Sequence, residues 1–289
     1  MQFLIYLLFY PLLWLISILP FRLLYLFSNF AYLIVYYIIG YRRPTVRENL
    51  LMAFPNLTEK ERLVIEKKSY RHLCDMFLEM IKTMSISEAG MDRRFKFTNL
   101  EAYTDLEKEN KSIALMCAHY ASYEWVISMN KYITFPGYAI YKRIANPYFD
   151  KLVRDIRSKF KAFLITTKDT IPTIKENEKN GIKGLYGFAS DQSPKSAKAF
   201  HWTTFMNIKT PVHTGAEMLA KKFDMNVIFL KVKKVKRGYY EASFELLSKD
   251  VRNVPDYNIT DEFLTRVEKQ IYEAPEFYLW THKRWKHRE

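Results

Sequence analysis

The first forty residues form an almost uninterrupted apolar run. "FLIYLLFYPLLWLISILP" covers residues 3 to 20, and "FRLLYLFSNFAYLIVYYIIG" follows at once over residues 21 to 40. As a helix each half spans roughly 26 Å, slightly less than the ~30 Å hydrocarbon core of a bilayer. Pro20 and Arg22 predict a break between the halves. A helical hairpin, a tilted span, two helices in the membrane interface and a pair of buried core helices all remain open.

We expect this segment to be retained as a membrane anchor over residues 1–41. No positive side chain precedes the apolar run and no A-x-A-like site follows it, so a cleaved signal peptide fits poorly. Its many tyrosines suit the headgroup level of a bilayer. Arg42, Arg43 and Arg47 come next, and the positive-inside rule then predicts that residues 42–289 form a domain on the cytoplasmic side.

Beyond the anchor, helical and strand patterns alternate. A long amphipathic helix begins at a capping box of Thr58 and Glu61 and runs to Met84. Further helices are predicted from about Tyr123, from Asn146 and after Asp169. Strand-like segments occupy residues 95–100, 112–118, 137–141, 162–166 and 182–190, and residues 227–247 have the pattern of a hairpin. The alternation predicts an α/β fold with a largely parallel or mixed central sheet flanked by helices.

The charge of the chain adds a partner class. Lys and Arg number 45 against 31 Asp and Glu, a net charge of +14, and Arg22 is the single charged residue among the first 39. The domain is therefore strongly basic, which suggests nucleic acid, an anionic membrane, or an acidic or phosphorylated partner. The lysines of "KVKKVKRG" fit the solvent face of an edge strand as readily as a nucleic-acid surface. No nucleic-acid-binding motif supports the latter, so we predict no nucleic-acid partner.

Metal and disulfide chemistry have no sequence signature. Cys74 and Cys117 lack the clustered spacing of a zinc site or a disulfide framework, and the six histidines are scattered. The sequence therefore predicts a reducing compartment and no metal site.

Candidate catalytic chemistry lies in "LMCAHYASYEW". His119 ends a predicted strand, and Glu124 falls in the first turn of the next predicted helix, where the helix dipole favours a carboxylate. A histidine whose far nitrogen bonds a carboxylate can act as a general base on an alcohol. The spacing alone is weak, because 31 of 289 residues are acidic. Cys117 is a rival nucleophile, although a cysteine within "ALMCA" is more typical of a core.

Several short blocks resemble, in order, those of the lipid A biosynthesis late acyltransferases (lauroyl/myristoyl acyltransferase-like), part of the wider H-x4-D/E lysophospholipid acyltransferase superfamily. "AHYASYEW" resembles their H-x4-[D/E] block, and "PEFYLWTHKRWKHRE" their tail. Ala121 and Ser122 depart from the family, which usually has Gly and Asn there. The second and third blocks, "YKRIANPYFDKLVRDIRSKF" and "ASDQSP", supply the matching residues Lys142, Arg143, Asn146, Arg157, Asp191 and Gln192.

The resemblance implies a membrane-associated enzyme that moves a fatty acyl chain from an acyl carrier protein thioester to a hydroxyl of a lipid A precursor, without a cofactor. It implies His119 as general base oriented by Glu124. Arg157 would hold an acceptor phosphate or order the site, and Asp191 would pair with a basic partner or with the acceptor. Lys142, Arg143, Asn146 and Gln192 would also bind substrate.

The implied partners are acyl carrier protein, a phosphorylated glycolipid and the membrane. The implied location is the bacterial inner membrane, with residues 42–289 as the acyltransferase domain on the cytoplasmic side. Backbone amides at the start of the helix after His119 would stabilise the oxyanion. The basic tail with two tryptophans suits an interfacial position.

Two alternatives stay open. An O- or N-acyltransferase acting on another bacterial lipid, such as an amino-acid lipid or lysophospholipid, would keep the base and change the acceptor. Ala118 stands where glycerolipid acyltransferases usually have Asn, and no "FPEGTRS"-like block occurs, so a lysophosphatidate acceptor is disfavoured. A non-catalytic membrane module that binds anionic lipids would need no base at all.

Overall fold

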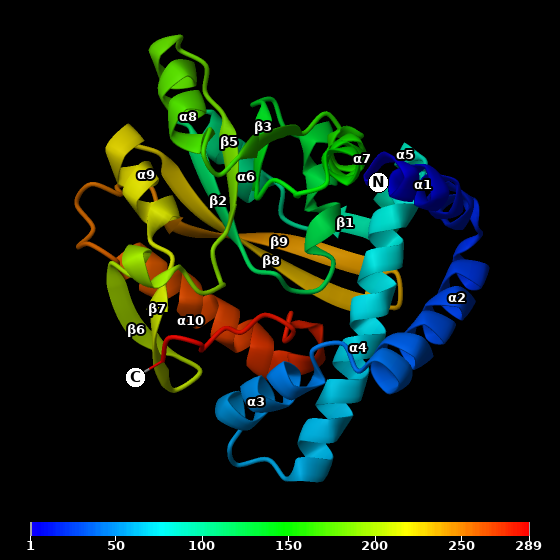
Figure 1. The fold of residues 1–289 in the computed structure, drawn as a ribbon. Helices are drawn as coiled ribbons and strands as arrows, with labels where there is room; N and C mark the ends of the chain where they lie inside the picture. The colour runs from blue at the N-terminus through cyan, green and yellow to red at the C-terminus, as the bar shows by residue number, and fades with distance from the viewer. Residues whose placement is uncertain (1, 289) are drawn as a thin grey trace.

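A seven-stranded sheet lies at the centre of the molecule (Figure 1). The structure, a computed structural model, describes residues 2–288 apart from the side chain of Lys198. The strand order is β1-β9-β8-β2-β5-β3-β4, with β8 and β9 antiparallel and the other pairings parallel. This confirms the predicted α/β fold. The strands of this sheet are β1 (Phe95–Phe97), β2 (Ile113–Cys117), β3 (Gly137–Tyr141), β4 (Phe163–Thr166), β5 (Leu185–Ala189), β8 (Asn226–Lys236) and β9 (Tyr239–Ser248).

Helices pack around the sheet, and the N-terminal helices lie beside it (Figure 1). They are α1 (Gln2–Ile18), α2 (Phe21–Leu33) with a π-helical turn (Ile34–Ile39), α3 (Arg43–Ala53), α4 (Glu59–Lys82), α5 (Glu88–Arg94), α6 (Glu101–Glu107), α7 (Pro147–Ser158), α8 (Thr170–Lys179), α9 (Gly215–Phe223) and α10 (Asn258–Glu273). Three 3₁₀ helices span Tyr123–Lys131, Ser196–Lys198 and Pro275–Phe277, and a separate antiparallel hairpin joins β6 (His201–Phe205) to β7 (Ile208–Val212).

The long helix α4 stands between the sheet and the apolar N-terminal helices (Figure 1). Its predicted capping box is confirmed: Thr58 Oγ1 accepts from the Glu61 N–H at 3.3 Å, and Glu61 Oε2 accepts from the Thr58 N–H at 2.7 Å. Reciprocal bonds of this kind pair two of the amides that a helix start leaves free. The same helix thus contacts both the anchor and the domain.

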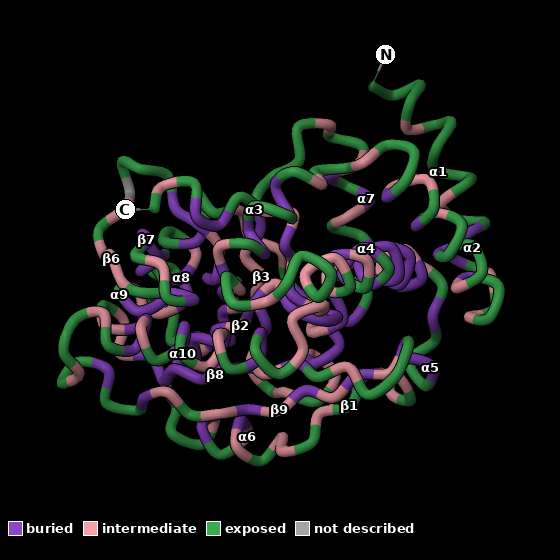
Figure 2. The backbone as a smooth tube through the Cα atoms, turned by 90° about the horizontal axis from the view of Figure 1, so that it is seen from below, coloured by how far each residue is buried: buried purple, intermediate pink, exposed green. Residues whose placement is uncertain are grey.

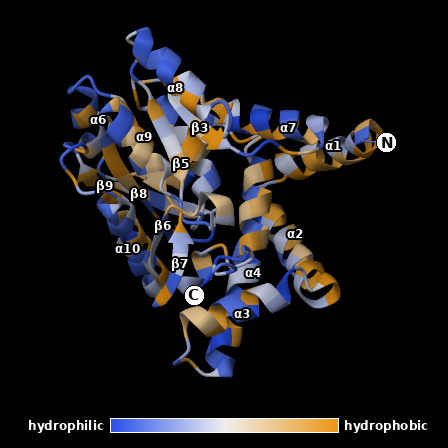
Figure 3. Ribbon diagram, turned by 60° about the vertical axis from the view of Figure 1, so that its left-hand side comes forward, coloured by the Kyte–Doolittle hydropathy of each residue, from blue (hydrophilic) through white to orange (hydrophobic). Residues whose placement is uncertain are grey.

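The segment predicted as an anchor forms two helices that break at Pro20, as predicted. In the described part of the chain, Phe21–Ile39 is the one helix long and apolar enough to cross a membrane, judged by length and composition, and α1 is apolar but shorter. Most of their large apolar side chains are exposed, so the alternative of two buried core helices is wrong (Figures 2 and 3). One polar stripe of α2 faces the domain, where Ser28 Oγ donates to Asp75 Oδ1 at 2.7 Å.

Two further expectations need correction. The segment from Tyr123 is a 3₁₀ helix and not an α-helix. Strand β8 pairs with β9 and with β2, but its pairing with β2 ends at Leu230, so its lysine-rich end is locally an edge. The Lys234 side chain is nevertheless only 10% exposed, so the prediction of a solvent face is wrong for this residue. Helix α10 and the β6–β7 hairpin were not predicted.

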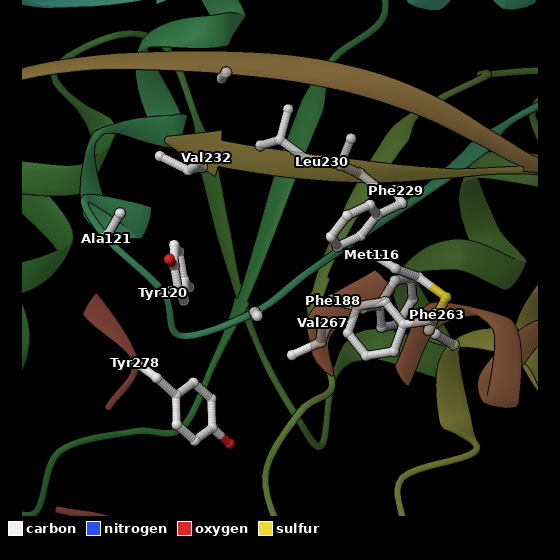
Figure 4. Packing of buried hydrophobic residues seen from close by; sticks show 14 of the residues in the cluster. Met116, Tyr120, Ala121, Phe188, Phe229, Leu230, Val232, Phe263, Val267 and Tyr278 are labelled. Atoms are coloured by element: carbon white, nitrogen blue, oxygen red, sulfur yellow. The ribbon is translucent and has the colours of Figure 1, made fainter. Parts of the chain in front are cut away.

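The core lies between the sheet and α10. Met116, Phe188 and Phe229, from three adjacent strands, pack against Phe263 and Val267 of α10 (Figure 4). Strand β2 is buried along nearly its whole length, which explains why its sequence is apolar without alternation. This buried strand gives the residues that follow it a rigid base.

Candidate active site

His119 and Asp191 meet at the carboxyl ends of two adjacent parallel strands. Cys117 of β2 lies in register with Ala189 of β5, and each of the two side chains comes two residues later. The ring Nδ1 of His119 lies 2.7 Å from Asp191 Oδ1, and the backbone N–H of His119 donates to the same oxygen at 3.1 Å. Open α/β sheets gather active groups at this edge.

The two residues shift each other's pKa in opposite directions. Burial lowers the pKa of His119, but the charge and hydrogen bond of Asp191 outweigh it, so the pKa is raised above its usual value. Burial raises the pKa of Asp191, but His119 outweighs that effect and the pKa is lowered. Asp191 is therefore ionised at neutral pH, Nδ1 carries a proton, and Nε2 is the ring nitrogen that can accept one.

The expectation that Glu124 orients His119 through a hydrogen bond is wrong in this structure. Glu124 Oε2 accepts from Arg157 Nε at 2.9 Å, and Oε1 accepts from Arg157 Nη2 at 2.6 Å. The 3₁₀ helix directs the buried Glu124 toward the last turn of α7, where the guanidinium fork matches the carboxylate. Both charges still act on the pKa of His119, which Glu124 raises and Arg157 lowers, each less than Asp191 does.

The loop after His119 takes a sharp turn at Ala121. Its φ is 50°, in the left-handed region that favours glycine. This explains in physical terms why the family block usually has Gly here. The turn brings the Ala121 N–H to the carbonyl oxygen of Phe277, a bond of 2.9 Å.

The C-terminal tail packs directly on this loop. The Leu279 N–H donates to the His119 carbonyl oxygen at 3.1 Å, and Tyr278 lies opposite Tyr120 in an antiparallel bridge (Figure 4). Trp280 and Trp285 are 2% and 1% exposed, so the predicted interfacial position of the tail tryptophans is wrong. They belong to the core that supports the loop of residues 118–122, the candidate catalytic loop.

The tail also supplies a buried cation near Asp191. Arg284 is 1% exposed, and its Nη1 donates to Thr210 Oγ1 and to the Pro211 carbonyl oxygen, both at 3.2 Å. Burial lowers the pKa of Arg284, opposed in part by Tyr278 and Asp191. Burial also lowers the pKa of His282 to about 4, so this imidazole is neutral and its Nε2 can accept from the Ser193 N–H at 3.3 Å.

A sequence model described as bacterial lipid A biosynthesis acyltransferase matches residues 1–287. The chain belongs to this family. It is 24% identical over 287 residues to the lipid A biosynthesis lauroyltransferase of Escherichia coli K12, covering 96% of this chain and 89% of that protein. It is 21% identical over 261 residues to the E. coli K12 palmitoleoyltransferase and to a Shigella flexneri lipid A biosynthesis acyltransferase, covering 86% of this chain and 79% of each. The predicted family is confirmed.

The remaining predicted substrate residues of this acyltransferase lie in two segments, the loop between β3 and the first residue of α7 and the position after Asp191. Asn146 caps α7, since its Oδ1 accepts from the Tyr148 N–H at 3.0 Å and the Phe149 N–H at 3.4 Å. Lys142 and Arg143 are exposed in the loop just before it. At 1.5 Å per residue, about 16 Å of helix separates Asn146 from Arg157.

Gln192 directly follows Asp191 and is half-buried. Of the eight predicted residues, the structure therefore brings together His119, Glu124, Arg157 and Asp191, with Gln192 beside them in sequence.

The structure gives little support to Cys117 as a nucleophile in this acyltransferase. Burial raises the pKa of the Cys117 thiol to about 12, so it is not a thiolate at neutral pH. Within residues 2–288, no group of three or more His, Cys, Asp or Glu side chains is placed to hold a metal ion. A cavity of about 20 Å³, large enough for one water molecule, lies against His119, His72 and Tyr278.

Proposed function

We propose that this acyltransferase moves a fatty acyl chain from an acyl carrier protein thioester to a hydroxyl of a lipid A precursor. The observation that carries the proposal is the His119 ring held by Asp191 with Nε2 as the proton-accepting nitrogen. Transfer to an alcohol needs such a base. Family membership supports the reaction class and a lipid A type of acceptor.

In the proposed mechanism, Nε2 of His119 removes the proton of the acceptor hydroxyl as its oxygen attacks the thioester carbonyl carbon. The tetrahedral intermediate then collapses, the carbon–sulfur bond breaks, and the departing thiolate takes the proton from the imidazolium. Asp191 stays ionised throughout, fixes the tautomer and stabilises the imidazolium. The products are an ester and the free thiol of the carrier.

The developing oxyanion needs nearby donors. The amides of Tyr123 and Glu124 begin a 3₁₀ helix, and the first amides of a helix lack an acceptor within it. We assign them to the oxyanion because the turn at Ala121 directs the chain from His119 into this helix. Neither Tyr123 nor Glu124 lines the small cavity beside His119. Because the acyl carbonyl must reach these amides, we do not assign the acyl group to that cavity.

Glu124 and Arg157 have a different role from the one predicted. Their bond uses Nε and Nη2 of Arg157 and leaves Nη1 to donate to an acceptor oxygen. The Arg157 side chain is 21% exposed and so can reach a ligand, whereas that of Glu124 is 9% exposed. We propose that Glu124 positions Arg157, and that Arg157 contacts the acceptor.

The proposed location is the cytoplasmic face of the bacterial inner membrane. The exposed apolar faces of α1 and α2 support membrane association, and the net charge of +14 suits anionic lipid and an acidic carrier protein. Arg43 and Arg47 contribute less to this field than the sequence indicated. Both pair with the buried Glu66, at 3.6 and 3.0 Å.

The test is mass spectrometry of lipid products from membrane-embedded wild type, His119→Ala and Asp191→Asn. The donor is acyl carrier protein thioester or acyl-coenzyme A, and the acceptor is tetra-acylated lipid A precursor or another bacterial lipid. One added acyl mass with wild type, absent with His119→Ala, supports the acceptor and the base together. Transfer from acyl-coenzyme A but not from the carrier thioester contradicts the donor. No transfer to lipid A precursor but transfer to another lipid contradicts the acceptor.

A further inference from the structure

A cationic pocket lies beside α2, next to the small cavity that adjoins His119. It has a volume of about 510 Å³ and lies between α2, α4 and the turn that joins β8 to β9. Its walls are Asn29, Tyr32, Leu33, Lys68, Arg71, His72, Asp75, Lys234, Arg237, Glu276 and Phe277. Four of these side chains are basic and two are acidic, so the pocket carries an excess of positive charge.

The two carboxylates leave part of this charge unpaired. Asp75 accepts from Arg237 Nη2 at 2.6 Å and also lies 3.6 Å from Lys234 Nζ, so one carboxylate serves two cations. Glu276 lies 3.8 Å from Lys68. Arg71 forms no ion pair within residues 2–288, and its guanidinium lies over the Tyr32 ring at 5.1 Å.

Two of the four cations, Lys234 and Arg237, are held in place, whereas Lys68 and Arg71 are exposed and can reach a ligand. The Lys234 side chain is 10% exposed and lies 3.3 Å from His72 Nδ1. Arg237 also donates to Asn29 Oδ1 at 2.8 Å. Burial and the charge of Lys234 keep the pKa of His72 well below its usual value. This wall residue is therefore neutral, and the positive charge of the pocket comes from its lysines and arginines. Preorganised cations of this kind favour a phosphate, which accepts several charge-assisted hydrogen bonds.

The pocket adjoins both the membrane face and the catalytic site. Leu33 lines the pocket and is 49% exposed. The π-helical turn that follows Leu33 carries two further exposed apolar side chains, Ile38 and Ile39. On the other side, His72 and Phe277 line both this pocket and the small cavity beside His119. A lipid whose headgroup entered the pocket would keep its chains on the apolar face of the anchor.

We propose that this pocket binds a phosphate group of a membrane lipid, and that the lipid is the phosphorylated acceptor. The second part rests on the proposed function, because it needs the acceptor to be a lipid A precursor. The first part does not, since any phosphate-bearing headgroup satisfies the same chemistry. Arg71 and Lys68, on one face of α4, are the residues assigned to the phosphate.

The test uses the full chain in nanodiscs of neutral phosphatidylcholine, with binding measured without donor so that no turnover is needed. The probes are phosphorylated lipid A precursor, its enzymatically dephosphorylated form, and phosphatidylglycerol. The variants are Arg71→Gln and Lys68→Gln. Lys60→Gln, which removes an exposed charge from the same helix outside the pocket, is the matched control, and Arg71→Lys retains the charge.

Loss of one charged contact is expected to weaken binding of the phosphorylated precursor roughly tenfold and to leave the dephosphorylated form unchanged. Lys60→Gln should bind like wild type. A loss for phosphatidylglycerol equal to that for the precursor supports the phosphate site but overturns the acceptor as its ligand. Wild-type affinity for every phosphorylated probe in both pocket variants overturns the site itself. If the precursor binds normally yet is never acylated, the proposed function fails and the phosphate site stands.

Discussion

One oxygen of Asp191 bonds His119 twice, accepting from the backbone N–H at 3.1 Å and from the ring at 2.7 Å. The same atom therefore fixes both the position of the loop and the tautomer of the ring. Asp191→Asn keeps the shape but loses the charge. We expect kcat to fall by about 10²- to 10⁴-fold while the fold is retained.

The same substitution predicts a shift in the pH profile. His119 must be unprotonated to act as base, and its pKa is raised by Asp191, so wild-type kcat/KM should rise with pH through a value above 6.5. Removal of the carboxylate charge removes that effect, so the acid limb of Asp191→Asn should move to lower pH. A rate profile from pH 5 to 9 with an unmoved acid limb would contradict the assigned coupling.

The bond between Glu124 and Arg157 predicts strong non-additivity. If Glu124 acts by positioning Arg157, then Arg157→Ala and the double variant with Glu124→Ala should have similar kcat/KM values. Glu124→Ala alone leaves a mostly buried guanidinium unpaired and should lower the free energy of unfolding by about 3 kcal/mol. A double variant whose loss is the product of the two single losses would mean that Glu124 acts independently of Arg157.

The buried position of Trp280 in the C-terminal tail predicts that its removal lowers the stability of the fold and leaves membrane binding unchanged. Trp280 is buried, and its carbonyl oxygen accepts from Asn49 Nδ2 at 2.8 Å. Trp280→Ala should lower the free energy of unfolding by about 3 to 5 kcal/mol, because a large buried side chain is lost. Partition into lipid vesicles should not change, and reduced partition of the folded variant would restore the interfacial interpretation.

Glu79 predicts pH-dependent stability. It is fully buried, its two oxygens accept from the hydroxyls of Tyr25 and Tyr240 at 2.8 Å each, and burial raises its pKa to about 7. The folded state then holds a proton that the unfolded state loses near pH 4.5. This stabilisation is complete below pH 4.5 and is lost as pH rises through about 7.

Glu79→Gln mimics the protonated carboxyl at every pH. Relative to wild type it should therefore gain stability on going from pH 5 to pH 8.5, by on the order of 3 kcal/mol. Unfolding in detergent at the two values checks this. A constant difference between the two proteins would show that Glu79 ionises in the fold as it does in the unfolded chain.

The sequence predicted the fold class and the place of His119 at the end of a strand, because both depend on local patterns. Alternation of strands and helices, and a histidine at a strand end, need no knowledge of strand order. The partner of His119 could not be found in this way, since Asp191 is 72 residues away and only the pairing of β2 with β5 brings it near. A signal was present, because both residues directly follow apolar strands at equal distance, but the neighbouring Glu124 satisfied the same chemical requirement.

The errors in the tail and the hairpin have a similar origin. Two tryptophans among basic residues fit a membrane interface by composition, and only the three-dimensional packing shows that they face inward. Likewise, alternating lysines indicate a solvated face, yet the Lys234 side chain is 10% exposed and lies 3.6 Å from Asp75.

The contact between the last residues and the catalytic loop has a consequence for synthesis. Phe277 and Leu279 complete the hydrogen bonds of the loop, and Arg42 and Asn49, just after the anchor, bond the tail at Thr281 and Trp280. Because synthesis runs from the N-terminus, residues 2–39 emerge from the ribosome before the segment that completes this loop. Until residues 277–281 have been made, the loop after His119 lacks these hydrogen bonds, so we expect a nascent chain that stops before them to hold His119 less rigidly.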